Sequence, residues 1–138
     1  MSEYEKFKTY LESTNFQERI NKLAKKYKNK KIIIYGAGVL FQVICDNYDL
    51  SGLNIVAVSD KKFKKEEVFY TKEHHNYRAI SPFLLEDMDF DLIIVANYNP
   101  LRLIKYLKTD MFYDTKITAV PFVKKGLRES FKELFKNK

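Results

Sequence analysis

The run KIIIYGAGVLF at residues 31–41 constrains the fold of this chain more than any other segment. Its apolar, β-branched start predicts a buried strand over Ile32–Tyr35, and the apolar residues after the second glycine have helical spacing. A strand, a tight glycine turn and a helix start in that order form the phosphate-binding corner of nucleotide-binding α/β folds. We therefore expect such a corner at residues 36–38.

The corner departs at one position from the dinucleotide-binding pattern G-x-G-x-x-G, whose third glycine permits close packing of the helix on the strand. Gly36 and Gly38 are followed by Phe41 where that third glycine would stand. We expect the Phe41 ring either to push the helix away from the strand or to fill space that a pyrophosphate site keeps clear. Neither outcome excludes a mononucleotide, but both weaken the case for a tightly held dinucleotide.

Further apolar runs alternate with helical patterns along the rest of the chain. These runs are nearly continuous in hydrophobicity, which is typical of strands covered on both faces of a parallel sheet. The alternation predicts the α/β class, as a Rossmann-like doubly wound parallel sheet of four or five strands in the order 3-2-1-4-5. The strands are expected at Ile32–Tyr35, Asn54–Val58, Leu92–Ala96 and Ile117–Val120, with Arg78–Ile80 as a short fifth candidate.

Start signals and spacing locate the helices. Ser81-Pro82 and Asn99-Pro100 each place a capping side chain before a proline at the first helical position. Apolar spacing predicts further helices over residues 2–11, 16–27 and 39–48, whereas residues 61–77 lack helical periodicity and are expected to form a loop. We expect one domain over residues 1–138, with a helical extension at 1–29, an α/β core at 31–120 and a C-terminal helix at 121–138.

The composition excludes several classes of protein. The net charge of +7 comes from lysines interleaved with glutamates on expected helix faces and element ends, so nucleic-acid binding is not expected. The single cysteine, Cys45, rules out a disulfide framework and lies in an apolar helical pattern, as a small buried hydrophobe would. No run approaches the ~20 apolar residues of a membrane span, and no signal-peptide core is present. We expect a cytoplasmic protein without membrane insertion.

Ligands of such sheets bind outside the carboxyl ends of the strands, where the strand order reverses. Segments 36–40, 59–62 and 97–99 are expected to meet there, with backbone N–H groups of the new helix directed at a phosphate. Asp60, which lies 24 positions past Gly36, would accept hydrogen bonds from a ribose, and the two asparagines would contact a base or sugar edge. The candidate binding residues are Gly36, Ala37, Gly38, Val39, Leu40, Asp60, Lys61, Asn97 and Asn99.

Each of these signals also has a purely structural interpretation. The glycines can serve only the sharp turn, Asp60 can open a loop, and Asn99 can act as a helix cap. The adjacent His74 and His75 diverge, so we interpret them as loop residues and not as a metal site. No catalytic residue is predicted, and the cofactor stays open between NAD(P) and a nucleotide-sugar.

With YGAG after the first strand, VSD closing the second and DLIIVA at the fourth, the chain resembles the small Rossmann-like domains of bacterial polysaccharide-biosynthesis proteins. These domains stand at the N-terminus of membrane-linked nucleotide-sugar dehydratases and of sugar-nucleotide acyltransferases. The resemblance covers residues 31–120 and implies that Gly36, Ala37 and Gly38 form the sugar-nucleotide turn, with Asp60 as the acid after the second strand. The catalytic module of those enzymes has no counterpart here, which implies a free-standing binding domain.

Three functions follow as hypotheses. The first is a stand-alone domain that binds a nucleotide or nucleotide-sugar in cell-envelope polysaccharide biosynthesis, without a complete active site, alone or beside a larger biosynthetic enzyme. The second is an interaction or regulatory scaffold that has lost its ligand and forms a homo- or hetero-oligomer through its Tyr- and Phe-rich preface. The third is a small NAD(P)-dependent oxidoreductase, for which no hydride-transfer site can be named.

Overall fold

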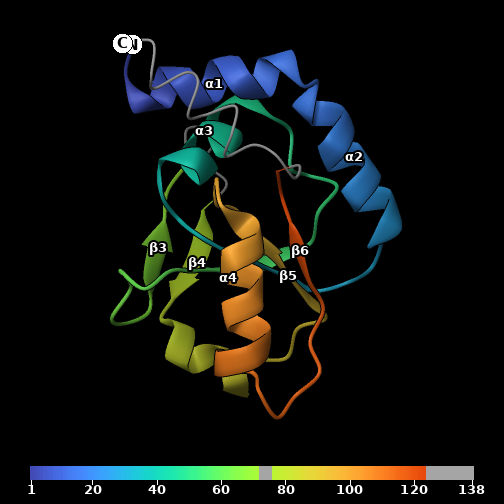
Figure 1. Ribbon diagram of the computed structural model, residues 1–138, viewed down its shortest axis with the longest axis vertical. Helices are drawn as coiled ribbons and strands as arrows, with labels where there is room; N and C mark the ends of the chain where they lie inside the picture. The colour runs from blue at the N-terminus through green and yellow to red at the C-terminus, as the bar shows by residue number, and fades with distance from the viewer. Residues whose placement is uncertain (72–75, 124–138) are drawn as a thin grey trace.

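The apolar run at residues 32–35 forms a central strand of a six-stranded sheet in the computed structural model, which describes residues 1–71 and 76–123 (Figure 1). The strands are β1 (Ile32–Tyr35), β2 (Ile55–Ser59), β3 (Glu67–Phe69), β4 (Tyr77–Ile80), β5 (Leu92–Val95) and β6 (Ala119–Pro121). The helices are α1 (Glu3–Ser13), α2 (Phe16–Lys26), α3 (Val39–Asn47) and α4 (Pro100–Tyr106), with a 3₁₀ helix η1 (Pro82–Asp87) and a π-helical turn η2 (Leu107–Met111).

The sheet has the strand order β3-β4-β2-β1-β5-β6, and every pairing is parallel except that of β3 with β4. The predicted α/β class with a largely parallel sheet is therefore confirmed. The prediction of a loop over residues 61–77 was wrong, because β3 forms there and adds a sixth strand. A strand of only three residues is too short to produce a readable alternation.

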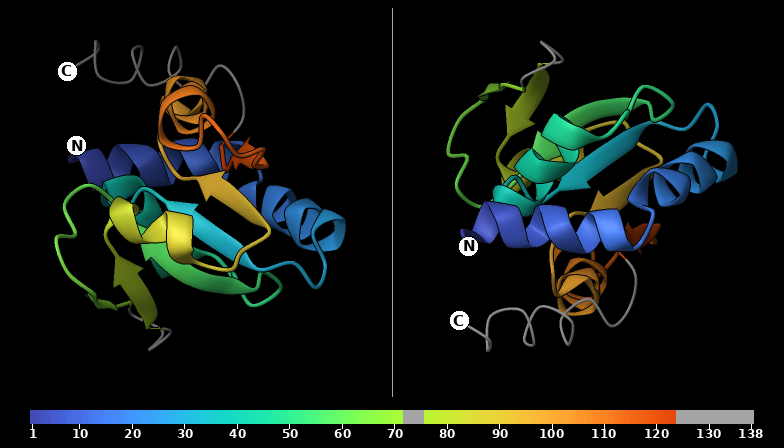
Figure 2. Two further views of the ribbon diagram at one scale, coloured as in Figure 1. Left: turned by 90° about the horizontal axis from the view of Figure 1, so that it is seen from below. Right: turned by 90° about the horizontal axis from the view of Figure 1, so that it is seen from above.

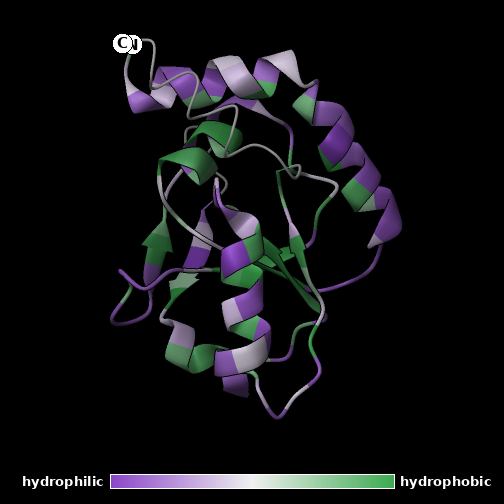
Figure 3. Ribbon diagram, viewed as in Figure 1, coloured by the Kyte–Doolittle hydropathy of each residue, from purple (hydrophilic) through white to green (hydrophobic). Residues whose placement is uncertain are grey.

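Apolar side chains fill both faces of the sheet, because successive residues of a strand point to opposite sides. Ile32 and Ile34 belong to the cluster beneath α1, α2 and α3, whereas Ile33 and Tyr35 pack on the side of η1 and α4. Figure 2 shows η1 on the side seen from below and α1 with α3 on the side seen from above. The hydropathy colouring in Figure 3 shows apolar central strands and a largely polar α2.

The N-terminal extension is part of this packing. Asn15 occupies the N-cap position of α2 without a side-chain cap bond, and its side-chain amide donates to Glu18 Oε2 at 3.0 Å. The guanidinium of Arg19 donates to the carbonyls of Pro121 and Phe122, at 2.6 and 3.3 Å. These bonds join α2 to the last described strand.

The C-terminal helix was expected at residues 121–138, but this predicted start is too early, because Pro121 is still in β6. Residues 124–138 lie outside the described part of the chain, as do His74 and His75. Among the described residues, no helix has the length and apolar character needed to cross a membrane.

Phe41 is a core residue. Its side chain is fully buried, and its ring centroid lies 5.3 Å from that of Phe69 in β3 and 6.2 Å from that of Tyr77 in β4. The ring therefore fills the space between α3 and the β3–β4 pair. These contacts test neither of the two outcomes expected for this position, which stay predictions.

We expect Phe41→Ala to lower the free energy of unfolding by about 3–5 kcal/mol, since it leaves a cavity between α3 and the outer strands. Phe83→Ala is the matched control, because the Phe83 side chain is 90% exposed and its loss should change stability by less than about 0.5 kcal/mol. Urea unfolding of both variants measures the difference. Equal losses of stability would contradict this packing.

Candidate functional site

Gly36 opens the glycine turn, defined as residues 36–38, in a conformation that only glycine adopts easily. Its φ is +114°, and a Cβ at this position would lie 2.5 Å from the carbonyl oxygen of Ala96. Its N–H donates to the Ser59 carbonyl at 2.8 Å, and Ala96 N–H donates to the Tyr35 carbonyl at 2.9 Å. Gly36 is thus required by the close approach of β1 to its two neighbours.

Gly38 differs, because nothing in the described structure requires glycine there. It is the N-cap residue of α3, with φ −90° and ψ −161°, an extended conformation open to any residue. A Cβ at Gly38 would have no atom within 4 Å, and no side chain caps the helix. The first backbone N–H groups of a helix have no partner within it, so those at the start of α3 are not used by the helix itself.

Asp60 and Lys62 hold the glycine turn from the end of β2. Asp60 Oδ2 accepts a hydrogen bond from Ala37 N–H at 2.8 Å, and its Oδ1 accepts one from Lys62 N–H at 3.1 Å. The Lys62 ammonium donates to the Ala37 carbonyl. Asp60 is therefore a turn residue, as its structural interpretation required, and its contact with a ribose stays a prediction. Since Ala37 N–H is already bonded, the phosphate donors that remain are those from Gly38 onward.

The third predicted segment, residues 97–99, lies at the edge of the sheet where β1 and β2 end, and the backbone before it makes the contact. Ala96, immediately before Asn97, is the residue that approaches Gly36. Asn97 Oδ1 accepts a hydrogen bond from Asn99 N–H at 2.7 Å, so the Asn97 side chain stabilises its own turn. Asn99 is at the N-cap position of α4 but makes no side-chain cap bond, so that part of the prediction was wrong. We call the edge where β1, β2 and β5 end the carboxyl edge.

On the α4 side of the carboxyl edge, the ring of Tyr106 lies next to a lysine. The Lys61 ammonium is 5.3 Å from the centroid of the Tyr106 ring. Tyr35 is buried nearby, and burial, followed by the charges of Tyr106 and Asp60, raises the pKa of its hydroxyl to about 12. Tyr35, Lys62 and Tyr106 were absent from the candidate set. Of these, only Lys62 had a signal in the sequence, as a neighbour of Asp60.

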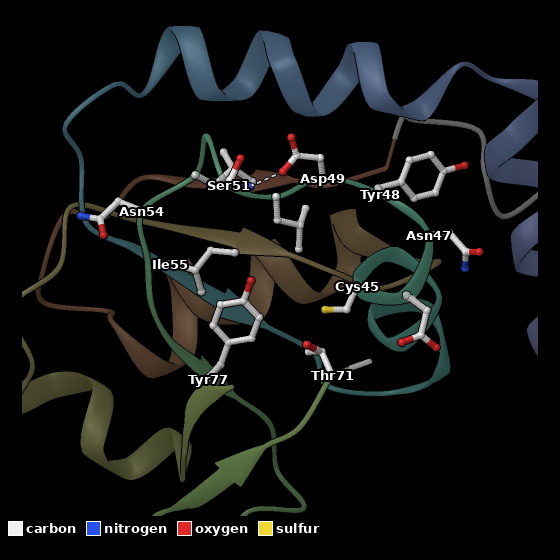
Figure 4. Close-up of a pocket in the computed structure, with 12 residues that line it drawn as sticks. Cys45, Asn47, Tyr48, Asp49, Ser51, Asn54, Ile55, Thr71 and Tyr77 are labelled. Atoms are coloured by element: carbon white, nitrogen blue, oxygen red, sulfur yellow. Dashed lines mark hydrogen bonds between the residues drawn. The ribbon is translucent and has the colours of Figure 1, made fainter. Parts of the chain in front are cut away.

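A separate cleft of about 620 Å³ opens at the other edge of the sheet, where β2 and β4 begin. Cys45, Thr71 and Tyr77 point toward it (Figure 4). Burial raises the pKa of the Cys45 thiol and of the Tyr77 hydroxyl to about 12, so neither ionises near neutral pH. Cys45 is thus buried, as the apolar helical pattern around it predicted. Within residues 1–71 and 76–123, no group of His, Cys, Asp and Glu side chains is arranged to hold a metal ion.

A protein-family model described as C2185-like, N-terminal, matches residues 28–117, which include every candidate binding residue. The chain belongs to this family. The C2185-like region starts before β1 and ends before β6, so the match spans the glycine turn and most of the sheet. No curated protein and no solved structure matches the chain. The resemblance to polysaccharide-biosynthesis domains therefore stays a prediction.

The two glycines should respond differently to the same substitution. We expect Gly36→Ala to lower the free energy of unfolding by at least about 2 kcal/mol, because its Cβ meets the Ala96 carbonyl at a positive φ. Gly38→Ala should change stability by less than about 1 kcal/mol, because its Cβ enters open space. Denaturant unfolding of the two variants tests this, and a large loss in Gly38→Ala would show that the fold itself needs that glycine.

Alkaline pH should destabilise the protein. Burial raises the pKa of Cys45 from 9.0, and those of Tyr35 and Tyr77 from 10.0, to about 12. The folded state then holds these protons more tightly than the unfolded state. The three groups therefore add their full contribution to the free energy of unfolding below about pH 9, and that contribution is lost as the pH rises toward 12. Urea unfolding from about pH 8 to about pH 11 measures the slope. Tyr77→Phe should make the slope of the unfolding free energy against pH less steep. A wild-type stability independent of pH would contradict the raised pKa values.

Proposed function

We propose that this protein binds a nucleotide or nucleotide-sugar at the carboxyl edge of its sheet, with a phosphate at the amino end of α3. The observation that carries the proposal is Gly38. The fold has no steric or conformational need for glycine at this position, whereas a phosphate held by backbone N–H groups needs the open space that a side chain would occupy.

Two further features support this location. With the antiparallel β3 set aside, the remaining strands follow the order β4-β2-β1-β5-β6, which corresponds to the Rossmann-like order 3-2-1-4-5. In that order the chain reverses between β1 and β5, where ligands of doubly wound sheets bind. Lys61 and Lys62 follow β2 at the same edge, and their charge favours an anionic group there.

The role in cell-envelope polysaccharide biosynthesis rests on the sequence resemblance alone. As part of the same proposal, the protein acts as a binding domain and supplies no complete active site. The other candidate, a scaffold without ligand, is favoured by a specific contact, because the bond from Ala37 N–H to Asp60 occupies one donor of the turn. The scaffold hypothesis predicts self-association or a protein partner in place of a small ligand.

Thermal unfolding with NAD, NADP, CoA, ATP and UDP-sugars tests the proposal. A ligand at a hundredfold excess over its dissociation constant stabilises the folded state by ~2.7 kcal/mol, so at least one of these compounds should raise the melting temperature. Gly38→Val is the matched control, since its side chain would project into the open space at α3 and should abolish the shift. Failure of every compound to stabilise the wild type would exclude this function and favour the scaffold.

A further inference from the structure

The hydroxyl of Tyr35 is a buried polar group that the fold does not use. Tyr35 ends β1 between Ser59 of β2 and Val95 of β5, and its side chain is only 3% exposed. Within the described part of the chain, its hydroxyl has no hydrogen-bond partner. Ser59, equally buried beside it, donates to the Ile80 carbonyl at 3.0 Å.

An unbonded buried hydroxyl is costly to the folded state. Leaving such a group without a partner costs about 1–3 kcal/mol, whereas phenylalanine would fill nearly the same space without that cost. The ring of Tyr35 accounts for its packing in the cluster with Ile33 and Val95, but not for its oxygen. A ligand that reached this oxygen would supply the hydrogen bond that it lacks.

The groups around Tyr35 indicate the chemistry of that partner. Asp60 and Tyr106 are the charged and titratable neighbours of the Tyr35 hydroxyl, and the Lys61 ammonium lies over the Tyr106 ring. The negative charge of Asp60 acts on the Tyr35 hydroxyl, and it disfavours a phosphate at that oxygen because like charges repel. A neutral group rich in hydroxyls can instead bond to the tyrosine and the carboxylate and pack on the aromatic ring.

We propose that the Tyr35 hydroxyl binds the sugar part of a nucleotide-sugar whose phosphate lies at the amino end of α3. This inference rests on the proposed function and narrows its ligand class. Tyr35 precedes the glycine turn on the α4 side, and Gly38 ends that turn at the start of α3. A ligand that crosses the turn at the carboxyl edge would reach both, displacing the exposed Lys61 side chain from Tyr106.

Isothermal titration with UDP and UDP-glucose tests the assignment in wild type, Tyr35→Phe and Tyr48→Phe. Tyr48 is the matched control, because its hydroxyl is likewise buried without a partner in the described structure, but it follows α3 at the helix's other end. We expect the wild type to bind UDP-glucose about two- to tenfold more tightly than UDP, the range of one hydrogen bond. Tyr35→Phe should remove that difference and leave UDP binding unchanged, whereas Tyr48→Phe should retain it. The melting temperatures of both unbound variants should equal or exceed that of the wild type.

The outcomes separate the two proposals. If the wild type binds both compounds and Tyr35→Phe keeps the preference for UDP-glucose, or if the wild type shows no preference, the role of Tyr35 is overturned while the binding function stands. A fall in the melting temperature of unbound Tyr35→Phe, absent from Tyr48→Phe, would also overturn it, because the hydroxyl would then be bonded within the free protein. Binding of neither compound to the wild type would overturn the assignment together with this form of the proposed function.

Discussion

The contact on which the rest of the structure depends is the approach of Gly36 to the carbonyl of Ala96. At this point β1 is hydrogen-bonded to both β2 and β5 through the residues that end the strands, so any Cβ would force the sheet apart. The same contact brings the turn after β5 to the turn after β1. Gly36, which the sequence pattern places in a ligand site, is thus required by the fold itself, with or without a ligand.

The residues after β2 hold that turn in position and thereby decide which atoms remain for a ligand. Asp60 bonds to Ala37 N–H and the Lys62 ammonium bonds to the Ala37 carbonyl, so both polar groups of the middle residue are used internally. The turn is consequently held in shape without a ligand. Free donors begin at Gly38, which moves the expected phosphate position one residue further into the start of α3 than a pattern of two glycines suggests.

Sequence patterns located most of the fold, because buried parallel strands and capped helices depend on local composition. Ile32–Tyr35 was predicted with its observed bounds, and Ser81 caps η1 through a bond from Phe83 N–H. One failure depended on distant contacts, because β3 exists through its pairing with β4 and its packing on α3. The other was local, because Asn99 bonds through its N–H to Asn97 Oδ1 and does not use its side chain as a cap. The site showed the same division. Its glycines were visible in the sequence, whereas the unbonded hydroxyl of Tyr35 becomes apparent only when its surroundings are known.

Phe41 and the edge strand β3, neither of which fits the expected dinucleotide-binding corner, belong to one packing contact. Phe41 replaces the third glycine, and Glu67–Phe69 form the edge strand β3 within the segment where a loop was expected. The ring of Phe69, in that strand, lies against Phe41, and so does the ring of Tyr77 in β4. A glycine at position 41 would leave the outer strands without this contact, so Phe41→Gly would report on how β3 and β4 are held and not on whether a ligand fits. In the proposed function, phosphate binding therefore depends on the turn held by Asp60 and on the open space at Gly38.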